Sequence, residues 1–253
     1  MLLGVIAHRK RGRRSNDWSN ALSMQTKYHV FVDFDGTISP LDTTDLLLER
    51  FADPRWRDIE EDWKAGRIGS RECMSRQIDL VRASPEQLDA FIADIDIDPG
   101  FPGFVRRCRV LGHSVTVMSD GLDRSVASAL RRAGLDLPFH ANRLEWIGGD
   151  RWRLTFPYAR SGCRSLAGNC KCQLAESERH AARIVVGDGR SDFCIAGWAD
   201  LVLAKGSLLA HCGQNGLPYI AFSEFADAID LIAGWLAARG REPTPPATYM
   251  GEQ

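Results

Sequence analysis

The segment that most constrains the fold is Tyr28 to Phe34, a run of β-branched and aromatic residues that carries carboxylates at its end. Such a run predicts a buried parallel strand. Its last residues enter Asp33-Phe34-Asp35-Gly36-Thr37, where a Gly-Thr turn follows. Because open α/β sheets bind ligands beyond the carboxyl ends of their strands, we expect Asp33 and Asp35 to lie at a ligand site.

Segments further along the chain repeat this order of short apolar strand and helix. We expect strands over 114–118, 184–186 and 201–203, and helices over 101–111, 123–133, 172–180, 193–198 and 226–238. Segments 143–146 and 152–156 flank a Gly-Gly-Asp turn, which predicts a β-hairpin. Strands that alternate with helices predict an α/β fold with a Rossmann-like, doubly wound parallel sheet.

Residues 42–94 differ from this pattern, since they contain helical stretches broken by proline and glycine and no convincing strand. They predict a small helical cap inserted after the first strand. The core is then expected over 28–41 and 95–240. Residues 1–27 are expected to form a disordered basic extension, and the Pro-rich residues 241–253 a loose tail.

Charge and hydropathy exclude several partners. The formal net charge is −1, so the whole chain gives no case for binding nucleic acid or an anionic membrane. No apolar run approaches the ~18 residues that span a bilayer. The basic run 8–14 fits either a nucleic-acid or lipid-binding arm or a tail, and we favour the tail. The oligomeric state is open, with a homodimer as one option.

Seven cysteines are an odd number for a chain of this length, so a complete disulfide framework is not expected. Without an export signal, the expected location is the cytoplasm, with the thiols reduced. Cys163, Cys170 and Cys172 raise the alternative of a zinc site, but they lack the standard Cys-x-x-Cys spacing and an obvious fourth ligand.

Polar clusters at three predicted strand ends can meet at one edge of the sheet. Asp33, Asp188 and a backbone carbonyl would form the hard oxygen cage that suits Mg²⁺. Ser119 and Lys171 could hold a phosphate. Each piece alone fits an ordinary turn, cap or surface lysine. Their occurrence together, in this order, favours phosphoryl transfer, in which positioning and charge neutralisation provide most of the catalysis.

These motifs resemble those of the haloacid dehalogenase superfamily of aspartate-nucleophile phosphatases, over roughly residues 28–240. The four motifs are Asp33 to Thr37, Ser119, Lys171, and Gly187 to Asp192. The resemblance implies a hydrolase of phosphoric monoesters whose expected partner is a small phosphorylated metabolite. It also implies a cap like that of the phosphoserine-phosphatase branch.

The same resemblance assigns roles to the site residues. Asp33 would attack phosphorus, while Asp35 would protonate the leaving group and then activate water. Mg²⁺ would be held by Asp33, the Asp35 carbonyl and Asp188, with support from Asp192. The phosphate would be held by three residues: Ser119, Asp120 through its backbone N–H, and Lys171. Asp120 stands where glycine is common in relatives, so its carboxylate is expected to point away from the phosphate.

The substrate is less constrained than the reaction. The segments 42–43, 54–56, 163–172 and 208–212 resemble the 2-hydroxy-3-keto-5-methylthiopentenyl-1-phosphate phosphatases of methionine salvage. Asp42 and Gln77 are the candidate substrate-binding residues. Gln77 aligns with the arginine that phosphoserine phosphatases use for the substrate carboxylate, which counts against phosphoserine. Phosphoserine or another small phosphate is the second choice, and a phosphotransferase or phosphate sensor is a distant third.

Overall fold

The structure is a computed structural model that describes residues 27–163, 165–177 and 182–239. One sheet of seven strands runs through it in the order β4-β3-β2-β1-β5-β6-β7. All neighbours pair in parallel except β3 and β4, which form the predicted antiparallel hairpin. The strands are β1 Tyr28–Val32, β2 Ser114–Leu122, β3 Phe139–Gly148, β4 Arg151–Thr155, β5 Ala182–Gly187, β6 Leu201–Ala204 and β7 Tyr219–Ala221.

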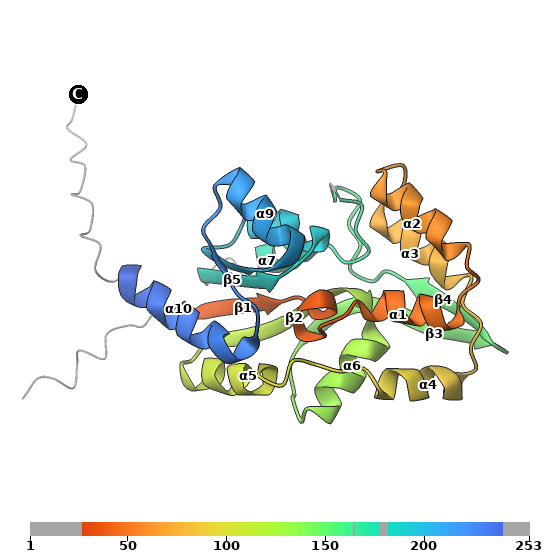
Figure 1. The fold of residues 1–253 in the computed structure, drawn as a ribbon, viewed down its shortest axis with the longest axis horizontal. Coiled ribbons are helices and arrows are strands. Elements are labelled where there is room, and N and C mark those ends of the chain that lie inside the picture. Colours follow the sequence, from red (N-terminus) through yellow and green to blue (C-terminus); the bar gives the residue numbers. More distant parts are fainter. Residues whose placement is uncertain (1–26, 164, 178–181, 240–253) are drawn as a thin grey trace, which may run out of the picture.

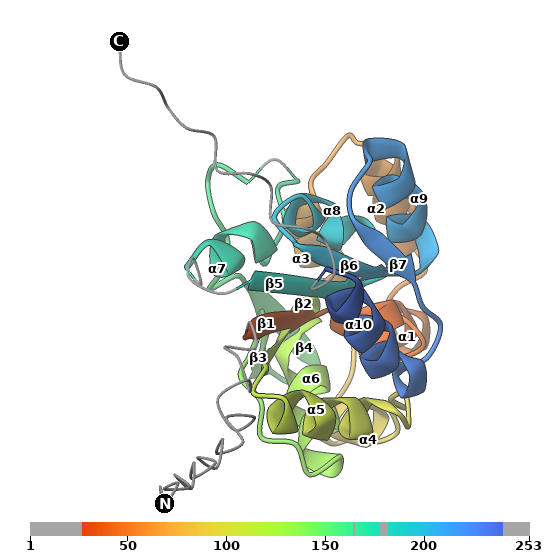
Figure 2. The same cartoon turned by 90° about the vertical axis from the view of Figure 1, so that its left-hand side faces the viewer.

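Helices cover both faces of this sheet. Figure 1 shows α5, α6 and α10 on one side and α7 and α9 on the other, and Figure 2 shows the same two layers from the end. The helices are α1 Thr43–Phe51, α2 Trp56–Lys64, α3 Ser70–Ile78, α4 Pro85–Ala93, α5 Phe101–Val110, α6 Asp123–Arg132, α7 Lys171–Ser177, α8 Phe193–Ala196, α9 Gly206–Asn215 and α10 Phe225–Arg239. The predicted doubly wound α/β fold is confirmed.

The alternation of side chains along β1 explains the two layers. Val30 and Val32 pack into the large apolar core with Phe101 and Phe225, under α5 and α10. Phe31 points to the opposite face and joins a second apolar cluster, under α8 and α9. Because successive strand residues face opposite ways, a strand buried on both faces must be mainly apolar, and the buried polar residue of β1, His29, is hydrogen-bonded to Thr116 Oγ1 at 2.8 Å. All five β1 residues are buried.

Residues 42–94 are all described, and they contain α1 to α4 and no strand longer than the single bridge Ala52–Val81. Asp42 caps α1 by accepting hydrogen bonds from the backbone N–H groups of Thr44 and Asp45. Figure 1 shows α2 and α3 on the α9 side of the sheet and α4 on the other side, beside α6. The part of the predicted cap that can cover a site at the sheet edge is therefore α2 and α3.

Some details of the prediction are wrong. The strand expected over 114–118 continues to Leu122, through an irregular stretch between Met118 and Leu122. Helix α9 and strand β7 were not predicted. The expected helix 172–180 begins at Lys171 and extends at least to Ser177, and 178–181 lie outside the described residues. So do residues 1–26 of the predicted extension and the tail 241–253.

The expectation of reduced thiols is also wrong for one pair, since Cys172 of α7 and Cys194 of α8 form a disulfide. The two residues are 22 positions apart, and the packing of α7 against α8 brings them together. Cys172 is therefore not available as a third thiolate beside Cys163 and Cys170. None of the helices in the described part of the chain is long and apolar enough to cross a membrane.

Candidate active site

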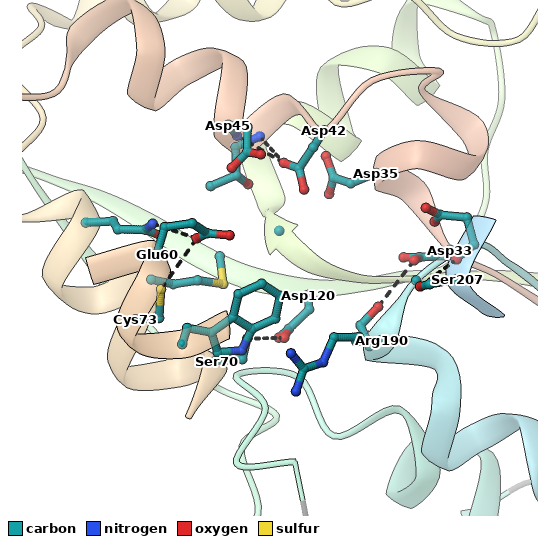
Figure 3. Close-up of a pocket in the computed structure, with 18 residues that line it drawn as sticks. Asp33, Asp35, Asp42, Asp45, Glu60, Ser70, Cys73, Asp120, Arg190 and Ser207 are labelled. Carbon is teal, nitrogen blue, oxygen red and sulfur yellow. Dashed lines mark hydrogen bonds between the residues drawn. The ribbon is translucent and has the colours of Figure 1, made fainter. Parts of the chain in front are cut away.

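A cavity of about 350 Å³ lies between the carboxyl edge of the sheet and helices α2 and α3. The core side of its wall carries Asp33, Asp35 and Asp188, and the cap side carries Glu60 and Gln77. In Figure 3, Asp33 and Arg190 lie on one side of this cavity and Glu60 and Cys73 on the other. The polar residues that follow β1 and β5 and those in the last part of β2 therefore converge on one cavity.

Asp33 follows β1 and is only 6% exposed. Its Oδ1 accepts a hydrogen bond from the Phe34 backbone N–H at 2.8 Å and lies 2.7 Å from the Lys171 ammonium. Lys171 also contacts Asp192 Oδ1 at 2.7 Å and Ser191 Oγ at 3.0 Å. These contacts leave the carboxylate of Asp33 with a single orientation, facing the cavity.

Lys171 is 1% exposed, which is exceptional for a lysine. Although burial alone would lower the pKa of its ammonium, the carboxylates of Asp192 and Asp33 raise that pKa. Lys171 is therefore a permanent cation at the base of the site. The predicted phosphate-binding lysine stands beside the predicted nucleophile.

Asp33, Asp188 and Asp192 form an acidic cluster, with one carboxylate oxygen of each within 4.8 Å of the others. Burial and then Asp33 raise the pKa of Asp188, and the same two causes raise the pKa of Asp192 well above its usual range. Lys171 supplies one positive charge to three carboxylates. A divalent cation with oxygen ligands would neutralise the remainder, and this donor set suits Mg²⁺.

Two glycines make room for this cluster. Gly36 has φ +70, and a Cβ there would lie 2.5 Å from Asp188 Oδ2. A Cβ at Gly187 would lie 2.3 Å from Asp192 Oδ2. Thr37 donates to Asp188 Oδ1 at 3.0 Å, which fixes that carboxylate. The Gly-Thr turn after β1 therefore makes room for, and donates a hydrogen bond to, the carboxylate of Asp188, which follows the distant strand β5.

Asp35 directly precedes the Gly-Thr turn, and both oxygens of its carboxylate accept hydrogen bonds. Oδ1 accepts from the Thr43 backbone N–H at 2.9 Å and from its hydroxyl at 2.6 Å, and Oδ2 accepts from Ser119 Oγ at 3.1 Å. Burial, followed by the charge of Asp42, raises the pKa of Asp35 to about 7. A carboxyl group with this pKa can donate and accept protons near neutrality.

Ser119 is completely buried and also accepts from the Gly121 backbone N–H at 2.8 Å. The carboxylate of Asp120 is bound by Ser70 Oγ of α3 at 2.6 Å and by the Asn169 backbone N–H at 2.8 Å. The Asp120 side chain thus has partners in the cap and in the loop before Lys171. Its expected phosphate contact, through the backbone N–H, stays a prediction.

Both candidate substrate residues line the cavity. Asp42 does so while capping α1, and burial followed by Asp45 raises its pKa to about 7. Gln77 is 3% exposed, and its Nε2 donates to Glu60 Oε2 at 3.0 Å. The structure brings the predicted site residues to this cavity or to the charged cluster beneath it, except Ser119, which lies behind the cavity wall and contacts Asp35.

Several wall residues were not predicted from the sequence: Asp45, Glu60, Trp63, Ser70, Cys73, Met74 and Arg190. The Arg190 guanidinium lies 5.0 Å from the centre of the Trp63 ring, which joins the core to the cap. Glu60 and Trp63 are three residues apart, and Ser70, Met74 and Gln77 are spaced at four and three. This spacing indicates shared helix faces, but not which face meets the cavity.

Comparisons with known proteins agree with this geometry. A family model described as haloacid dehalogenase-like hydrolase matches residues 30–197. The chain is 31% identical to a 2-hydroxy-3-keto-5-methylthiopentenyl-1-phosphate phosphatase of Brevibacillus brevis, over 83% of this chain and 96% of the relative. It is also 31% identical to a protein of the same name from Geobacillus kaustophilus, over 80% and 94%.

Solved structures show the same fold. A phospho-aspartyl intermediate analogue of phosphoserine phosphatase superposes with a TM-score of 0.62 at 21% identity, covering 83% of this chain and 99% of that one. Fold, site and relatives together define a phosphomonoesterase. With more than half of its length matched by the family model, the chain belongs to the haloacid dehalogenase-like hydrolases.

Proposed function

We propose that this chain hydrolyses a small phosphorylated metabolite through a phosphoaspartate on Asp33, with Mg²⁺ as cofactor. The observation that carries this proposal is the position of Asp33. Its carboxylate is paired with Lys171 at 2.7 Å and belongs to the acidic cluster with Asp188 and Asp192. Asp35, two residues along, is held ready for proton transfer by Ser119 and Thr43.

In this proposal, Asp33 attacks phosphorus and the ester oxygen leaves with the proton of Asp35. Lys171 and Ser119 neutralise and orient the phosphoryl oxygens. Asp35, now ionised, then removes a proton from the water that hydrolyses the phosphoaspartate. The raised pKa of Asp35 favours the first of these steps, because the acid form is populated near neutral pH.

The cation would be held by Asp33, the Asp35 backbone carbonyl and Asp188, with Asp192 in support. When bound, Mg²⁺ supplies positive charge that polarises phosphoryl oxygens. The arrangement of three buried or half-buried carboxylates around one lysine supports this assignment.

The named relatives support 2-hydroxy-3-keto-5-methylthiopentenyl-1-phosphate, or a compound like it, as the substrate. Gln77 supports the same choice, since it replaces the cation that a phosphoserine carboxylate would need. The cytoplasm remains the proposed location, although the Cys172–Cys194 disulfide argues against it.

The test is phosphate release from a panel of phosphorylated metabolites by the purified protein, with Mg²⁺ and with EDTA. We expect Mg²⁺-dependent turnover that is highest for the methylthio compound. Efficient turnover of phosphoserine with none of the methylthio compound would overturn the substrate assignment. Turnover that persists in EDTA would overturn the assignment of the metal.

A further inference from the structure

The cap side of the active-site cavity has a chemical character of its own. Helix α2 contributes Glu60, α3 contributes Gln77, and the first turn of α1 contributes Thr44 and Asp45. Of the described residues that line the cavity, Arg190 is the one cation, and it comes from the core. The cap wall therefore offers carboxylates, an amide and a hydroxyl to the group attached to the phosphate.

The Glu60 carboxylate is fixed in this wall. Its side chain is only 15% exposed, and Oε2 accepts from Gln77 Nε2 at 3.0 Å and from Cys73 Sγ at 3.8 Å. Among the described residues, the cation paired with it is Lys64, which is 3.8 Å from Oε1 and is itself 55% exposed. In Figure 3 the Glu60 carboxylate faces the open cavity from the cap side, opposite Asp33.

An independent feature of the same wall also points to a ligand. Thr44 is 7% exposed, and its Oγ1 is buried without a hydrogen-bond partner in the described part of the chain. A buried hydroxyl is costly when unpartnered, so a group that supplies a partner is expected beside it. Thr44 lines the cavity, and rotation of its side chain would bring this hydroxyl to a hydroxyl on a bound molecule, to which it can donate and from which it can accept.

From these contacts we infer that Glu60, Gln77 and Thr44 select an uncharged, hydroxyl-bearing leaving group and that Glu60 rejects leaving groups with a carboxylate. The inference rests on the proposed phosphatase activity and names the class of its substrate. Hydroxyl hydrogens can be accepted by Glu60, whereas a carboxylate placed beside Glu60 would face the negative charges of Glu60 and Asp45. A cationic group would meet Arg190, whose guanidinium reaches the Trp63 ring of α2.

The test compares two esters with the same three-carbon skeleton, glycerol 3-phosphate and 3-phosphoglycerate. Each is measured as a competitor of p-nitrophenyl phosphate hydrolysis, so that its inhibition constant is obtained whether or not it is turned over. We expect glycerol 3-phosphate to bind at least tenfold more tightly. Equal binding, or tighter binding of 3-phosphoglycerate, overturns the inference and makes Arg190 a carboxylate partner. Phosphoethanolamine that binds more tightly than glycerol 3-phosphate overturns the assignment of an uncharged group.

Variants separate the role of Glu60 from general effects. In Glu60→Gln the tenfold preference for glycerol 3-phosphate over 3-phosphoglycerate should decrease by a factor of at least three, because 3-phosphoglycerate should bind more tightly. The matched control is Glu61→Gln, because Glu61 is the next residue on α2 and its side chain is 69% exposed outside the cavity wall. Thr44→Val should weaken the binding of glycerol 3-phosphate at least threefold and leave the binding of 3-phosphoglycerate unchanged. An unaltered preference in both variants, with melting temperatures like the wild type, overturns the inference.

The control reaction distinguishes this failure from that of the proposed function. Hydrolysis of p-nitrophenyl phosphate by the wild-type protein in Mg²⁺ reports on Asp33 and its neighbours alone. If that reaction proceeds while the two competitors bind alike, only the specificity assignment fails. If it does not proceed at all, the phosphatase proposal fails and this inference fails with it.

Discussion

Gly121 offers a way to move the proposed acid–base residue without changing it. An alanine Cβ at this position would lie 2.3 Å from Asp35 Oδ2 and 3.0 Å from Ser119 Oγ, whereas ordinary contact begins at 3.4 Å. The Asp35 oxygen must therefore retreat by about 1 Å. Such a shift stretches its hydrogen bonds to Ser119 and Thr43.

A misplacement of this size typically costs about 100-fold in rate, so Gly121→Ala should lower kcat about 100-fold, or by about 2.7 kcal/mol of activation free energy. The assay is steady-state phosphate release in Mg²⁺, with thermal unfolding followed by circular dichroism. Because the clash is with a side chain, the melting temperature should change little. Gly162→Ala is the control, since its Cβ would have no neighbour within 4 Å. A Gly121→Ala protein with kcat within twofold of the wild type would refute the placement of Asp35.

Three further outcomes follow from the site and its supports. Lys171→Met leaves the carboxylates of Asp33 and Asp192 buried without their cation. In EDTA this substitution should therefore lower the free energy of unfolding, measured by urea titration, by about 3–5 kcal/mol. An unchanged midpoint of unfolding would contradict the pairing. Reduction of the Cys172–Cys194 disulfide, or Cys172→Ser, opens a loop of 22 residues and should cost about 3 kcal/mol, with Cys108→Ser, a buried free thiol, as the comparison. Mg²⁺ should raise the melting temperature of the wild type, because it binds the folded acidic cluster, and should have little effect on Asp188→Asn.

The sequence predicts the reaction centre well because its chemistry is tied to strand ends. Asp33, Ser119 and Asp188 each follow an apolar run, and parallel strands bring their carboxyl ends to one edge. Lys171 is harder to place, since it is the first residue of α7 and no strand ends beside it in the sequence. Burial at 1% exposure is what separates it from an ordinary surface lysine.

The cap wall could not be predicted in the same way. Glu60 lies on a strongly charged helix, where the pattern indicates a solvated face, and only the packing of α2 beside α3 turns it toward the cavity. The Cys172–Cys194 disulfide was missed for a similar reason, because it depends on contact between α7 and α8 and not on spacing. Local patterns define elements and their ends, whereas long-range packing decides which side chains meet.

The proposed mechanism requires Asp33 to be the residue that becomes phosphorylated. The direct measurement uses Asp35→Asn protein, in which hydrolysis of the phosphoaspartate should be slowed. The protein is mixed with radiolabelled substrate, quenched in acid and mapped by mass spectrometry. We expect label on the peptide that contains Asp33. The double variant Asp33→Asn/Asp35→Asn should carry no label there. Label on another residue, or rapid phosphate release by the Asp33→Asn protein, would contradict the proposed function.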